Sequence, residues 1–145
     1  MRTVRQLLAA KAPEIHAIGP DAAVIDAIRL MAEKRIGALL VMDGARLVGI
    51  LSERDYARKI VLDGRSSKDT PVRDIMTANV IGVRPEDTTD TCMQIVTNQR
   101  IRHLPVREGD EVVGVISIGD LVKAIIDDQQ FMIQQLERYI TGEKA

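Results

Sequence analysis

Two stretches of this chain repeat one pattern, and that repetition limits the possible fold more than any other feature. "GILSERD" occupies residues 49–55 and "GVISIGD" occupies residues 114–120, so each stretch has Gly, two apolar residues, Ser, two variable residues and Asp. With a shift of 65 positions, residues 15–61 align with residues 80–126 without a gap. A gapless match of this length indicates two copies of one structural unit.

The first half of each copy predicts a short strand followed by an amphipathic helix. Residues 15–18 and 80–83 are expected to be extended, and a helix follows that ends at Arg35 or Arg100. Cys92 stands in the apolar stripe of the second helix, so we expect a buried small side chain rather than a nucleophile. In the first copy the stripe at i, i+3, i+4 and i+7 consists of Val24, Ala27, Ile28 and Met31.

The second half of each copy predicts a β-hairpin and a closing helix. Apolar runs flank Asp43-Gly44 in the first copy and Glu108-Gly109 in the second, and Gly supplies the positive φ that a tight turn needs. A helix then begins at Ser52 or at Ser117. We therefore predict an α+β fold of two β-α-β-β-α repeats, packed sheet to sheet about a pseudo-twofold axis because each is too small to bury its own sheet.

The segments outside the aligned part predict the domain boundaries. The leader "VRQLL" at residues 4–8 resembles "VRDIM" at residues 72–76, but at an offset of 68. We predict the first repeat with its leader helix at residues 1–63, a polar linker at 64–71, the second repeat at 72–127 and a helical tail at 128–145. Apolar side chains at helical spacing predict a homodimer, because one chain has too few elements to cover them: Leu121, Val122, Ile125, Ile126, Met132, Ile133, Leu136 and Ile140.

Composition excludes several classes of function. The net charge of −1 gives no general attraction to nucleic acid or acidic membranes, and the chain has two Tyr, one Phe and no Trp for stacking bases. The longest apolar run is about seven residues, against about 20 for a membrane span. One cysteine suits a reducing cytoplasm. Two His without a duplicated catalytic pair, and no P-loop or metal-ligand cluster, predict that the protein is not an enzyme and holds no metal.

The repeated Ser-x-x-Asp motif has two interpretations. Ser52 and Ser117 can cap a helix, with Asp55 and Asp120 in the first turn, where the helix dipole favours an acid. A capping box more often uses Glu or Gln to reach back, however, and both copies have the shorter Asp. A short carboxylate at such a turn can instead accept hydrogen bonds from both hydroxyls of a ribose, while the helix N-terminus suits phosphate.

Positive charge differs between the copies. Arg102 and His103 precede "LPV" in the second copy, where the first has Gly37 and Ala38, and Arg54 stands inside the first motif only. Arg donates to phosphate oxygens in a planar, bidentate manner, so these residues are candidate phosphate contacts. The alternative for Arg102 is a solvated charge at a strand edge.

These features together resemble a tandem pair of CBS domains, also called a Bateman module. The resemblance rests on the two repeats, on "DIMT" at residues 74–77 and on "RHLPV" at residues 102–106. It implies a regulatory module that binds an adenosine compound in clefts between the repeats and signals to a separate, unknown protein partner. AMP is the first candidate, ahead of NAD, ATP or ADP, and S-adenosylmethionine is a further ligand of this family.

The resemblance also implies roles for individual residues. Asp55 and Asp120 would hold ribose, and Arg102 would meet phosphate near the pseudo-twofold axis. Ile101 and Pro105 would form apolar walls for adenine, with edge hydrogen bonds from Thr77 and Asn79. The aligned first-copy positions are Ile36, Leu40, Ala12 and Glu14. The alternative function is a structural, dimerising protein whose clefts are vestigial.

Overall fold

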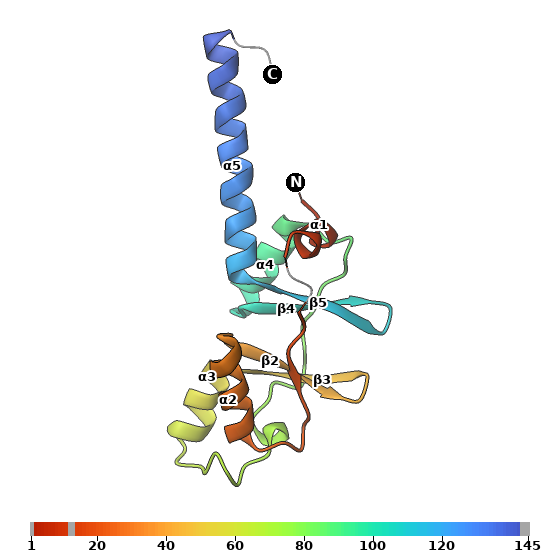
Figure 1. The fold of residues 1–145 in the computed structure, drawn as a ribbon, viewed down its shortest axis with the longest axis vertical. Helices are drawn as coiled ribbons and strands as arrows, with labels where there is room; N and C mark the ends of the chain where they lie inside the picture. The colour runs from red at the N-terminus through yellow and green to blue at the C-terminus, as the bar shows by residue number, and fades with distance from the viewer. Residues whose placement is uncertain (1, 12–13, 143–145) are drawn as a thin grey trace. The chain divides into compact units, whose positions relative to one another are not determined.

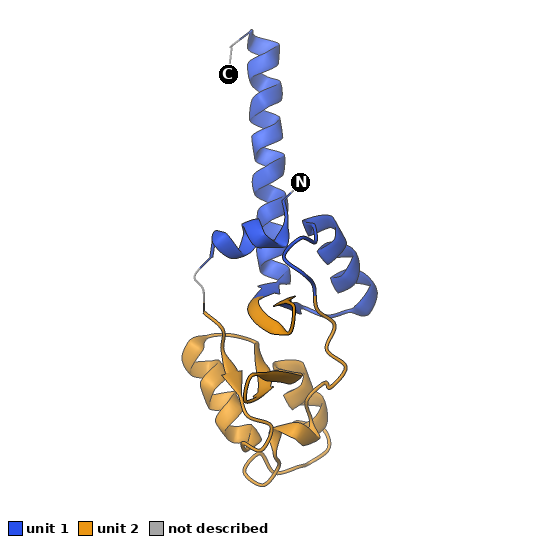
Figure 2. Ribbon diagram, turned by 90° about the vertical axis from the view of Figure 1, so that its right-hand side faces the viewer, with its two compact units in different colours: residues 1–13, 83–106, 115–145 blue, residues 14–82, 107–114 orange. Residues whose placement is uncertain are grey.

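The computed structural model describes residues 2–11 and 14–142 of the 145-residue chain. The chain forms two compact units, coloured separately in Figure 2. One unit comprises residues 1–13, 83–106 and 115–145, and the other residues 14–82 and 107–114. They are called unit 1 and unit 2 below. A three-stranded and a two-stranded sheet with flanking helices confirm the predicted α+β class.

The first repeat has the predicted order β-α-β-β-α (Figure 1). Strand β1 (Ala17–Ile18) pairs in parallel with β2 (Ala38–Asp43), which pairs antiparallel with β3 (Arg46–Ser52). Helix α2 (Val24–Lys34) connects β1 to β2, and the predicted apolar stripe of this helix faces the core. Helix α3 (Glu53–Tyr56) follows β3 and continues as a π-helical turn, η1, at Ala57–Val61.

The second repeat has the same helix and hairpin at aligned positions, but the strand predicted at residues 80–83 is reduced to a single bridge. Helix α4 (Thr89–Gln99) precedes strands β4 (His103–Glu108) and β5 (Glu111–Ser117). In place of a strand like β1, Val83 forms a single parallel bridge to Val106. That bridge aligns with the pairing of Ile18 and Val41 in the first repeat. The duplication in the sequence is therefore a duplication of backbone pairing.

Backbone geometry at the helix ends and hairpins also repeats. The predicted hairpin turns are present, with Gly44 at φ 62° and Gly109 at φ 64°, where a Cβ would be strained. Arg35 and Arg100 end α2 and α4 in the left-handed conformation, at φ 56° and 54°. Side chains other than glycine rarely adopt this conformation, so the matched pair indicates a fixed backbone path after each helix.

The first leader packs on the second repeat. Helix α1 (Val4–Ala9) belongs to unit 1, and Val4 and Leu7 are buried in the same apolar core as Cys92. The backbone N–H of Val4 donates to the carbonyl oxygen of Asp87 at 2.8 Å. Leader and repeat are thus joined across about 80 residues of sequence, both by apolar contact and by backbone hydrogen bonding.

The second leader packs on the first repeat in the same way. A 3₁₀ turn, η2 (Val72–Asp74), lies in unit 2, and Val72 and Ile75 are buried in the core of that unit. The backbone N–H of Val72 donates to the carbonyl oxygen of Ala22 at 2.8 Å, the aligned counterpart of the bond that Val4 makes. Each leader therefore completes the core of the other repeat. The domain boundaries given above from the sequence stay predictions.

Cys92 is a buried small side chain, as the stripe predicts. It is fully buried in the core of unit 1. Burial, with a smaller contribution from the charge of Asp87, raises the pKa of the Cys92 thiol to about 11. The thiol is therefore protonated at neutral pH, which makes it a poor nucleophile.

The closing helix of the second repeat and the predicted tail form one continuous helix, α5 (Ile118–Thr141). Leu121 and Ala124 in its first turns are buried in the core of unit 1. Its later turns extend away from α1 and α4, and their side chains are exposed (Figure 1). Within the described ranges, α5 included, no helix is apolar and long enough to cross a membrane.

Candidate functional site

Each Ser-x-x-Asp motif lies where a strand turns into a helix. Residues 52–55 are called the first acidic turn and residues 117–120 the second acidic turn. The Asp55 and Asp120 backbone N–H groups donate to the Ser52 and Ser117 hydroxyl oxygens at 3.2 and 3.1 Å. In return, the serine backbone N–H groups donate to the Asp55 and Asp120 Oδ2 atoms at 3.0 and 2.9 Å. Both motifs are complete capping boxes, in which the shorter Asp also reaches back to the serine N–H, so the helix-cap interpretation describes both turns and the ribose role of the two aspartates stays a prediction.

The second acidic turn also holds a lysine from the first leader. Lys11 Nζ donates to Asp120 Oδ2 at 2.8 Å and to the carbonyl oxygen of Val115 at 2.9 Å. The Lys11 side chain is 35 % exposed and the Asp120 side chain 28 % exposed. The leader thus brings a partly buried cation to a carboxylate 109 residues further along the chain.

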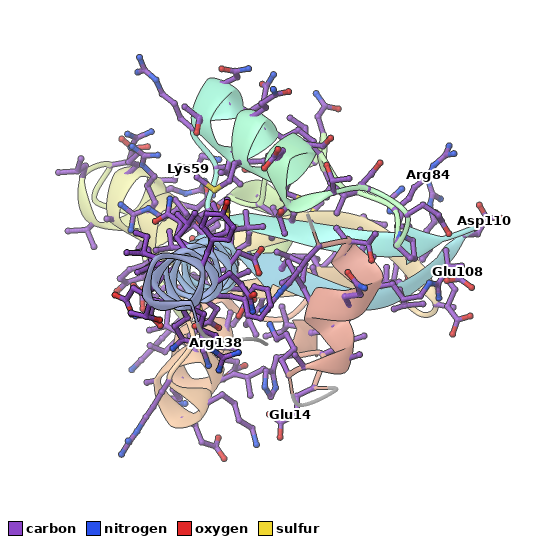
Figure 3. All side chains as sticks on the ribbon, turned by 90° about the horizontal axis from the view of Figure 1, so that it is seen from above. Glu14, Lys59, Arg84, Glu108, Asp110 and Arg138 are labelled. Carbon is purple, nitrogen blue, oxygen red and sulfur yellow. The ribbon has the colours of Figure 1, made fainter. Side chains whose placement is uncertain are left out.

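The first acidic turn has a lysine from its own helix. Lys59, labelled in Figure 3, lies in the π-helical turn, and its Nζ is 3.4 Å from Asp55 Oδ1. Lys59 Nζ also donates to the carbonyl oxygen of Ile75 at 2.9 Å. The Ser52 hydroxyl and backbone N–H both donate to Asp55 Oδ2, and Lys59 lies at Oδ1. Both oxygens of Asp55 therefore have a partner.

The two aspartates therefore differ in how their carboxylate oxygens are occupied by hydrogen bonds and ion pairs. Asp55 is 14 % exposed with contacts to both oxygens, whereas the hydrogen bonds from Lys11 and from the Ser117 backbone N–H both end on Oδ2 of Asp120. Burial raises the pKa of Asp120, but hydrogen bonds from Lys11 and Ser117, with the charge of Lys11, lower it by more. The net pKa of Asp120 lies below its ordinary value, so Asp120 is ionised at neutral pH.

The loop before β4 lies against the second acidic turn. The Ile118 backbone N–H donates to the carbonyl oxygen of Arg102 at 2.8 Å, which places Arg102 beside the first residue of α5. The Arg102 side chain is exposed, and Ile101 and His103 are half-buried on either side. Pro105 is buried, and its carbonyl oxygen accepts from the Val83 backbone N–H at 2.9 Å.

The aligned loop of the first repeat is built the same way. The Glu53 backbone N–H donates to the carbonyl oxygen of Gly37 at 3.0 Å, so this loop lies against the first acidic turn. Ile36 and Ala38 are half-buried beside it, and Arg54 in the turn itself has an exposed side chain. Gly37 and Ala38 offer no side-chain donor where the second repeat has Arg102 and His103.

Thr77 and Asn79 lie in unit 2, with the first acidic turn. The Thr77 backbone forms an antiparallel bridge to Ile50 of β3, with N···O distances of 2.9 and 3.0 Å in the two directions. Asn79 is exposed. Ile101 and Pro105, the other two residues predicted to contact adenine, belong to unit 1. An adenine site that combines residues of both units stays a prediction.

The path of Thr77 explains the glycine that opens the motif. A Cβ at Gly49 would lie 2.6 Å from the sulfur of Met76 and 3.0 Å from the carbonyl oxygen of Thr77. Only glycine lets the second leader pass this close to β3. Among the other first-repeat candidates, Leu40 is buried in β2, Glu14 pairs with His16 at 3.2 Å, and Ala12 lies outside the described residues.

Two lysines at the acidic turns escaped prediction from sequence. Lys59 could have been found, because it lies four residues after Asp55 and such pairs share a helix face. Lys11 also had a signal: at the leader offset of 68 it aligns with Asn79, a predicted site residue. What the sequence did not reveal is that the leader packs on the other repeat.

Two repeats of a helix, a β-hairpin and a closing helix, each with an acid at the N-terminus of that closing helix, define a tandem pair of small α+β domains. The family model of the CBS domain matches residues 4–62 and 72–127. The chain belongs to the CBS domain family.

Individual relatives agree with this assignment. The mitochondrial CBS domain-containing protein CBSX3 of Arabidopsis thaliana is 43 % identical over 127 residues, covering 84 % of this chain. The chain spans 62 % of the length of that relative. A CBS-domain protein from Burkholderia ambifaria MC40-6 has 55 % identity and a TM-score of 0.86, over 88 % of this chain and 96 % of its own. A CBS domain protein from Pyrobaculum aerophilum, solved in complex with AMP, has 27 % identity and a TM-score of 0.73, over 82 % of this chain and 89 % of its own.

Proposed function

We propose that the chain is a non-enzymatic regulatory module that binds an adenosine nucleotide and signals to a separate protein. The single observation that carries this proposal is the state of Asp120. Its carboxylate is ionised and partly exposed at the N-terminus of a 24-residue helix, and Lys11 and the Ser117 backbone N–H both donate to Oδ2. Oδ1 is then the oxygen that meets an incoming ribose hydroxyl, and hydrogen bonds to a charged acceptor are the stronger kind.

Phosphate recognition follows from the groups beside Asp120. Arg102 is held next to the second acidic turn through its carbonyl oxygen, and its side chain is exposed. A planar guanidinium donates two parallel hydrogen bonds to phosphate oxygens, and the dipole of α5 favours an anion at the same end. Arg54 has the corresponding role at the first acidic turn, where Asp55 is already engaged on both oxygens.

AMP is the ligand that we propose first, with NAD, ATP and ADP as further candidates. The similar protein from Pyrobaculum aerophilum was solved with AMP, which supports this order. A ligand that binds only the folded protein raises its melting temperature in proportion to the logarithm of its concentration. We expect AMP to do so, and we expect a co-purified adenosine compound in the supernatant of denatured protein by mass spectrometry.

A structural role without ligand is the second candidate, because each acidic turn is satisfied by the protein alone. Capping boxes account for both serines and both aspartates, and a lysine neutralises each carboxylate. If AMP, ATP, NAD and S-adenosylmethionine at millimolar concentration all leave the melting temperature unchanged, and no adenosine compound co-purifies, this candidate replaces the first.

We also propose that the protein is a homodimer joined through the outer part of α5. Six large apolar side chains there are between 54 % and 85 % exposed, and side chains surround the helix on all sides in Figure 3, where Arg138 is labelled. Ile126, Ile133 and Ile140 recur every seven residues, as do Ile125, Met132 and Tyr139, the spacing with which helices pack on one another. A helix end without neighbours is only marginally stable in water, so a partner helix would stabilise it.

Sedimentation at micromolar concentration tests the dimer. We expect twice the chain mass of 16.0 kDa, and a return to 16.0 kDa for Leu136→Glu, which puts a charge into the apolar face. Gln134→Glu adds the same charge beside that face and is expected to remain dimeric. A wild-type protein that sediments at 16.0 kDa refutes the dimer.

The single cysteine supports a reducing cytoplasm as the compartment that we propose.

A further inference from the structure

The two repeats differ in how the backbone beside each acidic turn is satisfied. In the first repeat the Ile50 carbonyl oxygen accepts from the Thr77 backbone N–H at 2.9 Å. The aligned carbonyl in the second repeat belongs to Val115, and it accepts from the side chain of Lys11 at 2.9 Å. A leader side chain thus stands where the other repeat uses leader backbone, and it brings a positive charge with it.

That charge is fixed in place and only partly used. Lys11 Nζ has three N–H donors, and Val115 and Asp120 accept two of them. The Lys11 side chain is 35 % exposed, so the third N–H can meet a ligand oxygen. Lys59 differs from Lys11, because it comes from the same helix as its aspartate and lies 3.4 Å from it rather than 2.8 Å.

We propose that Lys11 makes the second acidic turn selective for phosphate-bearing ligands over the uncharged nucleoside. This inference rests on the proposed function, whose ribose contact is Asp120. A carboxylate that binds ribose repels the phosphate of the same ligand a few ångströms away. Lys11 cancels that repulsion and offers its third N–H to a phosphate oxygen, while adenosine gains nothing from the added charge.

Lys11→Met tests the inference, because it keeps the chain length and removes the charge. Nitrogen-15 NMR titrations with AMP and with adenosine, followed at the Ser117 amide, report the second acidic turn separately from the first. Losing one opposite charge near the phosphate is expected to weaken AMP binding by about tenfold or more. Adenosine binding is expected to stay within about twofold, since a neutral ligand has no Coulomb interaction with that charge.

The ratio of the two dissociation constants distinguishes ligand selection from a purely structural role. A lysine that only supports the Val115 carbonyl would weaken both ligands by the same factor, and that result overturns the inference. Lys11→Arg keeps the charge and is expected to retain the wild-type ratio. Lys68→Met, at an exposed position in unit 2, removes one positive charge elsewhere and is also expected to retain it.

A probe without ribose separates failure of this inference from failure of the proposed function. Inorganic pyrophosphate is expected to shift the Ser117 amide signal in the wild type and not in Lys11→Met. If pyrophosphate behaves in this way while AMP and adenosine do not bind, the ribose site is lost and the role of Lys11 stands. If pyrophosphate shifts the signal equally in both proteins, or in neither, Lys11 selects no phosphate.

Discussion

Replacing Asp120 by Glu separates its two possible roles, because Glu keeps the helix cap and moves the carboxylate. Glu is the residue that most often completes a capping box at this position, so Asp120→Glu retains the acceptor for the Ser117 N–H, now 2.9 Å from Oδ2. The added methylene displaces the carboxylate from the position that a ribose would meet. Asp120→Ala removes both functions and serves as the comparison.

The structure gives different magnitudes for folding and for binding. Asp120→Ala keeps the Ser117 N-cap but leaves the Ser117 N–H and Lys11 without their carboxylate, and losing such a hydrogen bond costs about 0.5–1.5 kcal/mol of unfolding free energy. We expect Asp120→Glu to stay within about 0.5 kcal/mol of the wild type. For ligand binding, hydrogen bonds to a charged group are worth about 1.5–3 kcal/mol each. Losing two costs about 3 kcal/mol or more, which is over a hundredfold in affinity.

Urea unfolding and calorimetric titration with AMP measure the two quantities. The expected result is that Asp120→Glu folds like the wild type and binds AMP at least tenfold more weakly, since a displaced carboxylate loses one or both hydroxyl contacts. Asp55→Glu is the matched change at the first acidic turn. Normal AMP affinity in Asp120→Ala, with earlier unfolding, would show that Asp120 is a helix cap and nothing more.

Three further predictions follow from the packing and the pKa shifts. Gly49→Ala should lower the free energy of unfolding by about 1–3 kcal/mol in urea, because its Cβ would lie 2.6 Å from the Met76 sulfur, while Gly19→Ala, with no atom within 4 Å, should have little effect. The lowered pKa of Asp120 contributes stability above the unfolded pKa, near 3.8, that is lost as pH falls through the folded pKa. The difference in unfolding free energy between wild type and Asp120→Asn should therefore be constant above about pH 5 and shrink below about pH 4. A difference that becomes larger at acid pH would contradict this prediction. Cys92, with a pKa near 11, should react with a thiol reagent at pH 8 only after unfolding, and rapid labelling of the native protein would show that it is accessible.

The repeated order of elements could be predicted because its signals are local. A helix stripe, an Asp-Gly or Glu-Gly turn and a Ser cap each lie within a few residues, so Gly44, Gly109, Ser52 and Ser117 specify their own backbone. The gapless alignment then doubled each signal. The same locality explains why both aspartates were found as candidate site residues.

The roles of those aspartates were less predictable, because the donors that contact a carboxylate can come from distant parts of the chain. Asp120 meets a lysine 109 residues away, whereas Lys59 beside Asp55 lies only four residues further on and could have been found from the helical spacing. Neither contact follows from the spacing of Ser and Asp. The difference between the contacts of the two carboxylates therefore became visible only in the structure.

The sequence by itself determined that the chain has two β-α-β-β-α repeats, where each hairpin turns and which residue caps each closing helix. Only the tertiary structure decided that each leader packs on the other repeat, with Val4 and Leu7 in one core and Val72 and Ile75 in the other. The physical reason is that periodicity shows which face of a segment is apolar, but two similar leaders fit two similar cores equally well by that criterion. The choice between them depends on contacts between residues far apart in the chain, and it is this choice that places Lys11 beside Asp120.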